Sequence, residues 1–157
     1  MPSECLLIDP NDRGLRGKVE SLPKTPGICI FIDIRRSTGL KCADLKEWVA
    51  KIHNCFANAQ TFLSPFTPIK SMGDALMYYI EDTDLSESKN NVLQIYDGLW
   101  QMATDTSPEY PEVRISAVSC EEVFPISFFP GQRDYYGIDI DLASKLQSNR
   151  VLKYSAY

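Results

Sequence analysis

The hydrophobic and polar positions of the chain first indicate where its strands lie. Residues 28–32 form an apolar run rich in β-branched and aromatic side chains, so we predict a buried strand there, and residues 113–118 are predicted to form a further strand. Within residues 67–80, two apolar runs are separated by Gly73 and Asp74 alone. A two-residue loop of this kind is typical of a tight β-hairpin, which we therefore predict here.

Helices are indicated by apolar residues that recur every three or four positions. This spacing is found over residues 45–63, 92–102 and 137–147. The polar residues 81–89 are expected to form a loop, and residues 123–129 a short extended piece. The resulting order, β-α-ββ-α-β-(β)-α, predicts an α+β fold. We expect a ferredoxin-like or palm-type sandwich with helices on one face of a mainly antiparallel sheet.

A single domain is expected to take up most of the chain. With 157 residues, the protein is long enough to bury a core without disulfide or metal staples. Residues 1–26 contain several prolines and little periodicity, so we expect an N-terminal arm or a poorly ordered lead-in there. The domain itself is placed at residues 27–157.

Composition and charge indicate in which cellular compartment the protein is expected and which kinds of partner it is expected to bind. The apolar fraction of 44% is ordinary, no apolar run approaches the roughly 18 residues of a membrane span, and no secretory signal is visible. The five cysteines form no CxxC pair, which favours reduced thiols in a cytoplasmic protein over a zinc site or a disulfide framework. The net charge of −5 argues against nucleic acid as a partner. It is compatible with a small anionic ligand held by a few local cations.

Two carboxylates occupy positions where packing does not explain them. Asp33 ends the apolar run 28–32, and Asp74 lies at the tip of the predicted hairpin. A charged group at the end of a buried strand is costly unless it is solvated, paired or bound to a metal. If the strand and the hairpin are neighbours, the two acids form an all-oxygen site of the kind that Mg²⁺ or Mn²⁺ takes with phosphates. The alternative is that both are solvated turn residues.

Four segments in this order resemble the catalytic domain of class III nucleotidyl cyclases. These enzymes convert a nucleoside triphosphate into a 3′,5′-cyclic monophosphate and pyrophosphate. The segments are residues 31–38, 69–77, 113–123 and 134–146. Each motif alone is weakly specific, and the assignment depends on their occurring together in the family's order.

The resemblance implies a site for metal and phosphates. Asp33 and Asp74 match the family's metal-binding aspartates, with the carbonyl of Ile34 as a further ligand, so two divalent cations, Mg²⁺ or Mn²⁺, are implied. The backbone that opens the first helix matches the segment that binds the β- and γ-phosphates. This segment includes Arg36, Ser37 and Thr38.

The resemblance also implies a base-binding pair. Lys70 and Asp134 match the two residues that recognise adenine in adenylyl cyclases, where guanylyl relatives carry Glu and Cys, so ATP is favoured. Judged from the residues alone, Lys70 is equally well explained as an exposed strand lysine. For Asp134, the alternative is an ion pair with the adjacent Arg133 in a surface loop.

The last motif departs from the family at two catalytic positions. Asp141 stands where cyclases have the Asn that orients the ribose, and Lys145 stands where they have the Arg that stabilises the transition state. Lys offers a point charge in place of a bidentate fork. The two residues also have the spacing of an ordinary i,i+4 salt bridge. Two glycines usual in the third motif are replaced by Ser116 and Cys120.

Three functional hypotheses follow from this resemblance. The first is a stand-alone cyclase that prefers ATP and acts as a homodimer, each site taking residues from both subunits. The second is a cytidylate or uridylate cyclase that makes a signal in bacterial anti-phage defence, because a bare catalytic domain is also what those enzymes look like. The third is a pseudo-cyclase, a nucleotide-binding dimerisation module without turnover. The two metal-type aspartates argue against the third.

Overall fold

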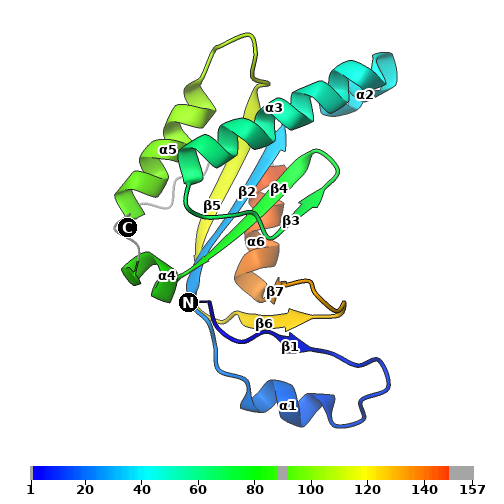
Figure 1. The fold of residues 1–157 in the computed structure, drawn as a ribbon, viewed down its shortest axis with the longest axis vertical. Helices are drawn as coiled ribbons and strands as arrows, with labels where there is room; N and C mark the ends of the chain where they lie inside the picture. Colours follow the sequence, from blue (N-terminus) through cyan, green and yellow to red (C-terminus); the bar gives the residue numbers. More distant parts are fainter. Residues whose placement is uncertain (1, 88–91, 149–157) are drawn as a thin grey trace.

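A computed structural model describes residues 2–87 and 92–148 of the chain. Its centre is a four-stranded antiparallel sheet in the order β3-β4-β2-β5 (Figure 1). The strands are β2 (Gly27–Ile34), β3 (Lys70–Met72), β4 (Ala75–Glu81) and β5 (Val113–Cys120). The predicted α+β architecture, the buried strand at residues 28–32, the strand at residues 113–118 and the hairpin are therefore confirmed.

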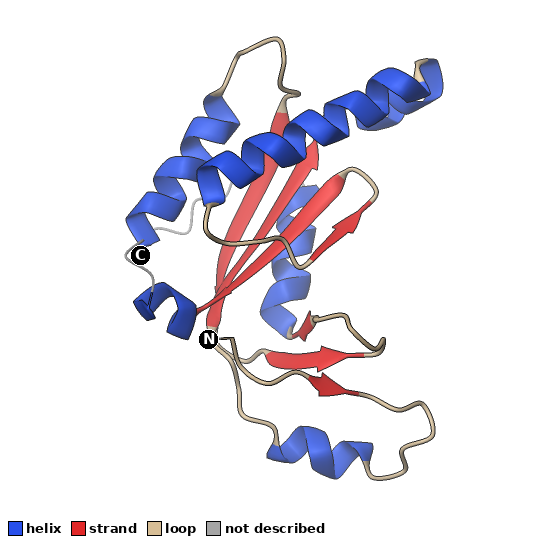
Figure 2. Cartoon of the chain, viewed as in Figure 1, coloured by secondary structure: helices blue, strands red, loops and turns tan. Residues whose placement is uncertain are grey.

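Helices cover both faces of this sheet, where the sequence had indicated one. Three long helices surround it, α3 (Leu45–Leu63) and α5 (Val92–Thr104) on one face and α6 (Ile138–Ser148) on the other (Figures 1 and 2). The isoleucines of β2 pack with α3 and α5, whereas Cys29 and Phe31 pack with Ile140 and Ala143 of α6. The physical reason is visible in β2, because an apolar run without polar alternation needs cover on both sides.

The N-terminal segment is an ordered arm and not a poorly ordered lead-in. It contains β1 (Leu6–Leu7) and α1 (Leu15–Ser21). Strand β1 pairs in parallel with β6 (Phe124–Ser127), which pairs with β7 (Tyr135–Tyr136) to make a second, three-stranded sheet. The backbone N–H groups of the arm therefore find partners in β6, which fixes the segment to the domain.

Besides α1, two further short helices were not expected from the pattern. They are α2 (Ser37–Ala43) and α4 (Asp82–Glu87). The α4 helix occupies most of the predicted loop at residues 81–89, of which residues 88 and 89 lie outside the described part. Asp82 and Asp84 stand in its first turn, where carboxylates stabilise a helix N-terminus. None of the helices in the described ranges is long and apolar enough to cross a membrane.

Candidate active site

Strand pairing brings Asp33 and Asp74 to the same end of the sheet. Asp33 lies directly opposite Ala75 in the β2–β4 ladder, and Asp74 is the residue before Ala75. The turn between β3 and β4 consists of Gly73 and Asp74, and Gly73 has a φ of 63°, as tight hairpin turns of the primed types require. The predicted proximity of the two carboxylates is therefore a consequence of register.

The electrostatics of this aspartate pair are unfavourable without a cation. Burial, and then the negative charge of Asp74, raise the pKa of the Asp33 carboxyl, against the opposing effects of Arg114 and the Ile34 N–H group. Arg114 compensates incompletely, since its Nη2 atom is 3.7 Å from Asp33 Oδ2. Burial and the same two acids also raise the pKa of Cys55 on α3, to about 12. The negative potential of the pair thus extends into the core.

The donor set of the pair fits a hard divalent cation. Carboxylate oxygens suit Mg²⁺ and Mn²⁺, which also keep waters or phosphates in their shell. In the described ranges there is no group of three or more His, Cys, Asp or Glu side chains that could hold a metal. A cation here would therefore take two protein carboxylates and complete its shell with other oxygens. The carbonyl of Ile34 as a ligand stays a prediction.

The segment after β2 is held against the aspartate pair. The Ser37 hydroxyl donates a hydrogen bond to Asp74 Oδ2, and Ser37 is the first residue of α2. Arg36 precedes it with a φ of 57°, a left-handed conformation that is uncommon outside glycine. Arg36 and Thr38 are exposed. The expectation that this segment opens a helix is confirmed, although α2 is separate from the long helix α3.

Lys70 and Asp134 form an ion pair, although they are far apart in the sequence. Lys70 Nζ lies 2.9 Å from Asp134 Oδ1 and 2.7 Å from Oδ2. The Oδ1 atom also accepts a hydrogen bond of 2.8 Å from the backbone N–H of Tyr135. Arg133 bonds to Glu81 at 2.7 Å. The reading of Asp134 as the partner of Arg133 is therefore wrong, and Lys70 is more than an exposed strand lysine.

Asp141 and Lys145 lie on the outer side of α6. Both are exposed, whereas Ile140 and Ala143 of the same helix are buried against the sheet. Residues four apart on a helix share a face, so Asp141 and Lys145 point away from the sheet that carries Asp33. Within one chain, the structure does not bring them to the aspartate pair.

Ser116 and Cys120, which stand where the family usually has glycine, fit into the packing of the domain. The Ser116 hydroxyl donates a hydrogen bond of 2.8 Å to the carbonyl of Ala143 in α6. Cys120 is 1% exposed and packs in the cluster that contains Cys29. Both side chains therefore fit between the sheet and α6, and their presence leaves the fold intact.

Several contacts of the site were not foreseen from the sequence. They are the bond from Ser37 to Asp74, the position of Arg114 beside Asp33, and the bonds of Arg133 and Tyr135 to Glu81. Each depends on which residues face each other across strands or loops. No local sequence signal specifies this.

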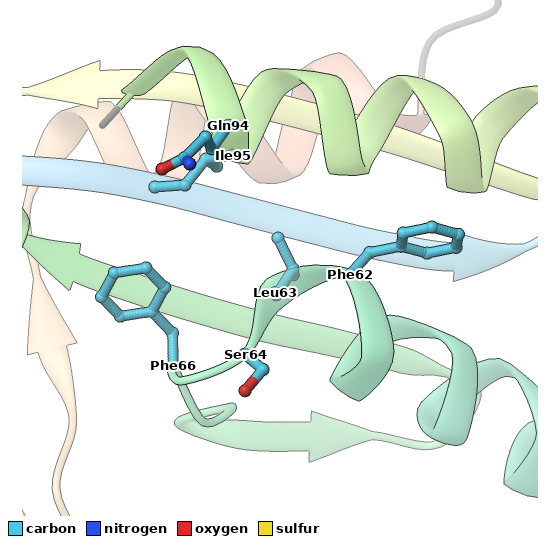
Figure 3. A pocket seen from close by; sticks show the side chains of 6 residues that line it. All are labelled: Phe62, Leu63, Ser64, Phe66, Gln94 and Ile95. Atoms are coloured by element: carbon cyan, nitrogen blue, oxygen red, sulfur yellow. The ribbon is translucent and has the colours of Figure 1, made fainter. Parts of the chain in front are cut away.

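A pocket of about 120 Å³ lies elsewhere, between the C-terminal end of α3 and the start of α5 (Figure 3). It is lined by Phe62, Leu63, Ser64, Phe66, Gln94 and Ile95. The α3 helix has 19 residues and a length of about 28 Å, and α2 and Ser37 precede its other end. The pocket is therefore separate from the aspartate pair.

Comparisons with known proteins agree with this geometry at the level of the fold. The chain matches the crystal structure of the adenylyl cyclase CyaB from P. aeruginosa with a TM-score of 0.58, at 17% identity over 82% of this chain and 74% of that chain. The chain has the fold of class III nucleotidyl cyclase catalytic domains. A structure of a bacterial light-regulated adenylyl cyclase gives a TM-score of 0.59 at 16% identity, over 80% of this chain and 40% of the other.

A guanylyl cyclase is also among the similar structures. The guanylate cyclase domain of RhGC from Catenaria anguillulae, solved in complex with GTP, gives a TM-score of 0.54 at 13% identity over 80% of this chain and 73% of that chain. No family model matches the sequence, and no curated protein gives a significant match. Adenylyl and guanylyl cyclases are therefore both among the structures that share this fold. The fold alone does not specify which base the protein binds.

Proposed function

We propose that the protein is a nucleotidyl cyclase that converts a nucleoside triphosphate, ATP by preference, into a 3′,5′-cyclic nucleotide and pyrophosphate. The observation that carries the proposal is the presence of two separate pairs on a cyclase fold. Asp33 and Asp74 provide adjacent carboxylates, and Lys70 and Asp134 provide a joined cation and anion. The first pair suits metal and triphosphate, and the second suits a base.

The chain's own groups have distinct tasks in this reaction. The segment with Arg36, Ser37 and Thr38 holds the β- and γ-phosphates, and Asp141 and Lys145 take the places of the ribose-orienting and transition-state residues. The ribose 3′-oxygen bonds to the α-phosphorus and its proton passes to solvent. The bond between the α-phosphorus and the oxygen that bridges it to the β-phosphorus breaks, which releases pyrophosphate. Two divalent cations at Asp33 and Asp74 would supply activation of the 3′-hydroxyl and neutralisation of the triphosphate.

A homodimer with shared sites is part of the proposal. Asp141 and Lys145 point away from the sheet of their own chain, so a site that uses them together with Asp33 and Asp74 draws on a second subunit. Exposed apolar side chains near the same helix offer a contact surface. They are Phe128, Phe129, Tyr136, Ile138 and Leu142, with Ile138 83% exposed. Tyr135, by contrast, is buried and stacks on Tyr79 with ring centroids 4.2 Å apart.

The base preference is inferred from donors and acceptors. A Lys70 ammonium donates to adenine N1, and the Asp134 carboxylate accepts from the 6-amino group. Cytosine presents the same pattern at N3 and its 4-amino group. A cytidylate cyclase, with a role in anti-phage defence, is therefore the second candidate. Five free cysteines support a reducing, cytoplasmic setting for either enzyme.

The test is a product analysis with all four nucleotides. Purified protein is incubated with Mn²⁺ and an equimolar mixture of ATP, CTP, GTP and UTP, and the products are separated and identified by mass. The proposal expects cyclic AMP to dominate, with cyclic CMP second. A dominant cyclic CMP would favour the second candidate. No cyclic product from any nucleotide, while the protein still binds nucleotide, would indicate a pseudo-cyclase.

A further inference from the structure

The residues on either side of Asp134 are fixed to one buried carboxylate. Arg133 Nη2 donates to Glu81 Oε1 at 2.7 Å, and the Tyr135 hydroxyl donates to the same oxygen at 2.6 Å. Arg133 Nε also donates to the Tyr135 hydroxyl at 2.7 Å. Glu81 is 1% exposed and ends the central strand β4. The backbone of Asp134 is thus held from both sides.

The same carboxylate binds the N-terminal strap, defined here as residues 2–8. The backbone N–H of Ser3 donates to Glu81 Oε2 at 2.8 Å, and its hydroxyl donates to Oε1 at 2.9 Å. The carbonyl of Ser3 accepts a hydrogen bond from Arg133. Glu81 therefore receives donors from the strap and from both neighbours of Asp134.

A backbone route connects the strap to Asp134 as well. Strand β1, within the strap, pairs with β6 so that Leu6 lies opposite Ile126. The N–H group of Ile126 donates to the carbonyl of Asp134 at 3.1 Å. Lys70, the partner of Asp134, lies on β3 in the other sheet. The distance between the Lys70 ammonium and the Asp134 carboxylate therefore depends on the position of the strap and of the second sheet relative to β3.

Glu81 is ionised in this network. Burial alone would raise its pKa, but the hydrogen bonds from Tyr135, Ser3 and Arg133 outweigh burial and lower the pKa of the carboxyl. Removing one partner of a buried charge is strongly destabilising. The network is therefore suited to hold the loop that contains Asp134 in one place.

We propose that the strap, Glu81 and Arg133 position Asp134, and that they thereby set how tightly and how selectively the protein holds the nucleotide base. The inference rests on the proposed function, since Asp134 reads a base only in a protein that binds nucleotides. Arg133, Glu81 and Ser3 are positioning residues, because they act through Asp134. Their loss is expected to affect KM and base preference more than kcat.

The test uses full-length variants that break the network at different points. Arg133→Met removes the charge that faces Glu81, and Ser3→Pro removes the N–H and hydroxyl donors of the strap. Arg133→Lys keeps the charge and serves as the conservative rescue. The matched control is Lys24→Met, because Lys24 forms an exposed ion pair with Glu122 outside the network. Should Arg133→Met fail to fold, the Ser3→Pro and Arg133→Lys variants still test whether the network positions Asp134.

Two quantities are measured for each variant. The first is KM and kcat with ATP and with GTP, and the second is amide hydrogen exchange of residues 124–136 without nucleotide. Arg133→Met and Ser3→Pro are expected to raise KM for ATP and reduce the preference for ATP over GTP by about tenfold, as the loss of one well-placed hydrogen bond to the base would. Exchange should become faster in both, with kcat within about twofold of wild type, while Lys24→Met resembles wild type and Arg133→Lys recovers most of the preference.

The outcomes separate this inference from the proposed function. If the wild type cyclises nucleotides and the variants keep its KM and base preference, the positioning role is overturned, even where exchange becomes faster. The inference is also overturned if kcat falls by the same factor as the preference for ATP over GTP, or if Lys24→Met behaves like Arg133→Met. Either result would mean that the network only supports the fold. A wild type that neither turns over nor binds nucleotide overturns the proposed function, and this inference with it.

Discussion

The two charged pairs of the site differ in how they are built and in what they lack. Asp33 and Asp74 are like charges brought together by neighbouring positions of one ladder, and Arg114 offsets them only from 3.7 Å. Lys70 and Asp134 are opposite charges that satisfy each other at 2.7 Å across two sheets. The first pair needs a cation to complete it. The second is complete without a ligand and needs a base that can share its hydrogen bonds.

The difference suggests a division of labour. A site with uncompensated negative charge is suited to bind metal and to act on the triphosphate, so its loss should affect turnover. A self-satisfied ion pair is suited to discriminate among ligands, because a base with the wrong hydrogen-bond pattern leaves one partner unpaired.

The largest effect is expected from removing either aspartate of the first pair. Asp33→Ala or Asp74→Ala should lower turnover by several orders of magnitude, because each would supply half of the protein's carboxylate ligands. Turnover with Mn²⁺ is compared with that of wild type, and circular dichroism checks that the fold is intact. Near-normal turnover in either folded variant would rule out the proposed metal site.

A smaller, selective effect is expected from changing the second pair. The double change Lys70→Glu with Asp134→Cys installs the residues that guanylyl relatives carry, and it should shift the preference from ATP towards GTP. The opposing hydrogen-bond patterns of the two bases are worth on the order of 1–3 kcal/mol, or roughly tenfold in the ratio of kcat/KM. An unchanged ratio would mean that other residues read the base.

In the absence of metal, neutralising one charge should change the melting temperature in opposite directions for the two pairs. Asp33→Asn relieves repulsion and should raise the melting temperature, whereas Asp134→Asn breaks an ion pair and should lower it. For a chain of this size, each kcal/mol corresponds to a shift of about 2–4 °C. Calorimetry in the presence of a chelator measures both. Shifts in the same direction would contradict the contrast drawn here.

The smallest effect concerns pH and Glu81. Because the folded-state pKa of Glu81 is lowered from its ordinary value of 4.5, its contribution to stability is present above that value and is lost as the pH falls below it. The difference in melting temperature between wild type and Glu81→Gln should therefore narrow from pH 7 to pH 3. Glu20→Gln is the control, since Glu20 lies in an exposed pair with Arg16. A difference independent of pH would indicate that Glu81 is not ionised in the folded protein.

Much of the fold was predictable because it depends on local patterns. The Gly73-Asp74 turn and the helix at residues 45–63 are specified by turn chemistry and apolar spacing, and both are confirmed. The cover on both faces of the sheet was missed, although the unbroken apolar run of β2 contained the signal. The order of residues 2–26 had no such signal, because it depends on contacts such as that of Ser3 with Glu81, 78 positions away.

The site was predictable in part, for a related reason. The proximity of Asp33 and Asp74 follows from a strand end and a hairpin tip. For Asp134 the sequence offered the adjacent Arg133 as an ion-pair partner, whereas the structure pairs Asp134 with Lys70 and Arg133 with Glu81. The side of α6 that Asp141 and Lys145 occupy was equally undetermined. Their outward position is what makes a second subunit necessary in this account.

The central claim is that aspartates of one subunit and Lys145 of another complete one active site. Its most direct test mixes Asp74→Ala protein with Lys145→Ala protein under conditions where subunits exchange. Random exchange leaves one intact site in the mixed dimers, so we expect recovery of about a quarter of wild-type activity. The control mixture of Asp33→Ala with Asp74→Ala should recover none, because both changes damage the same half of the site. The predicted result is that activity recovers in the first mixture and not in the control mixture. If subunit exchange is demonstrated and neither mixture recovers activity, the shared active site is contradicted.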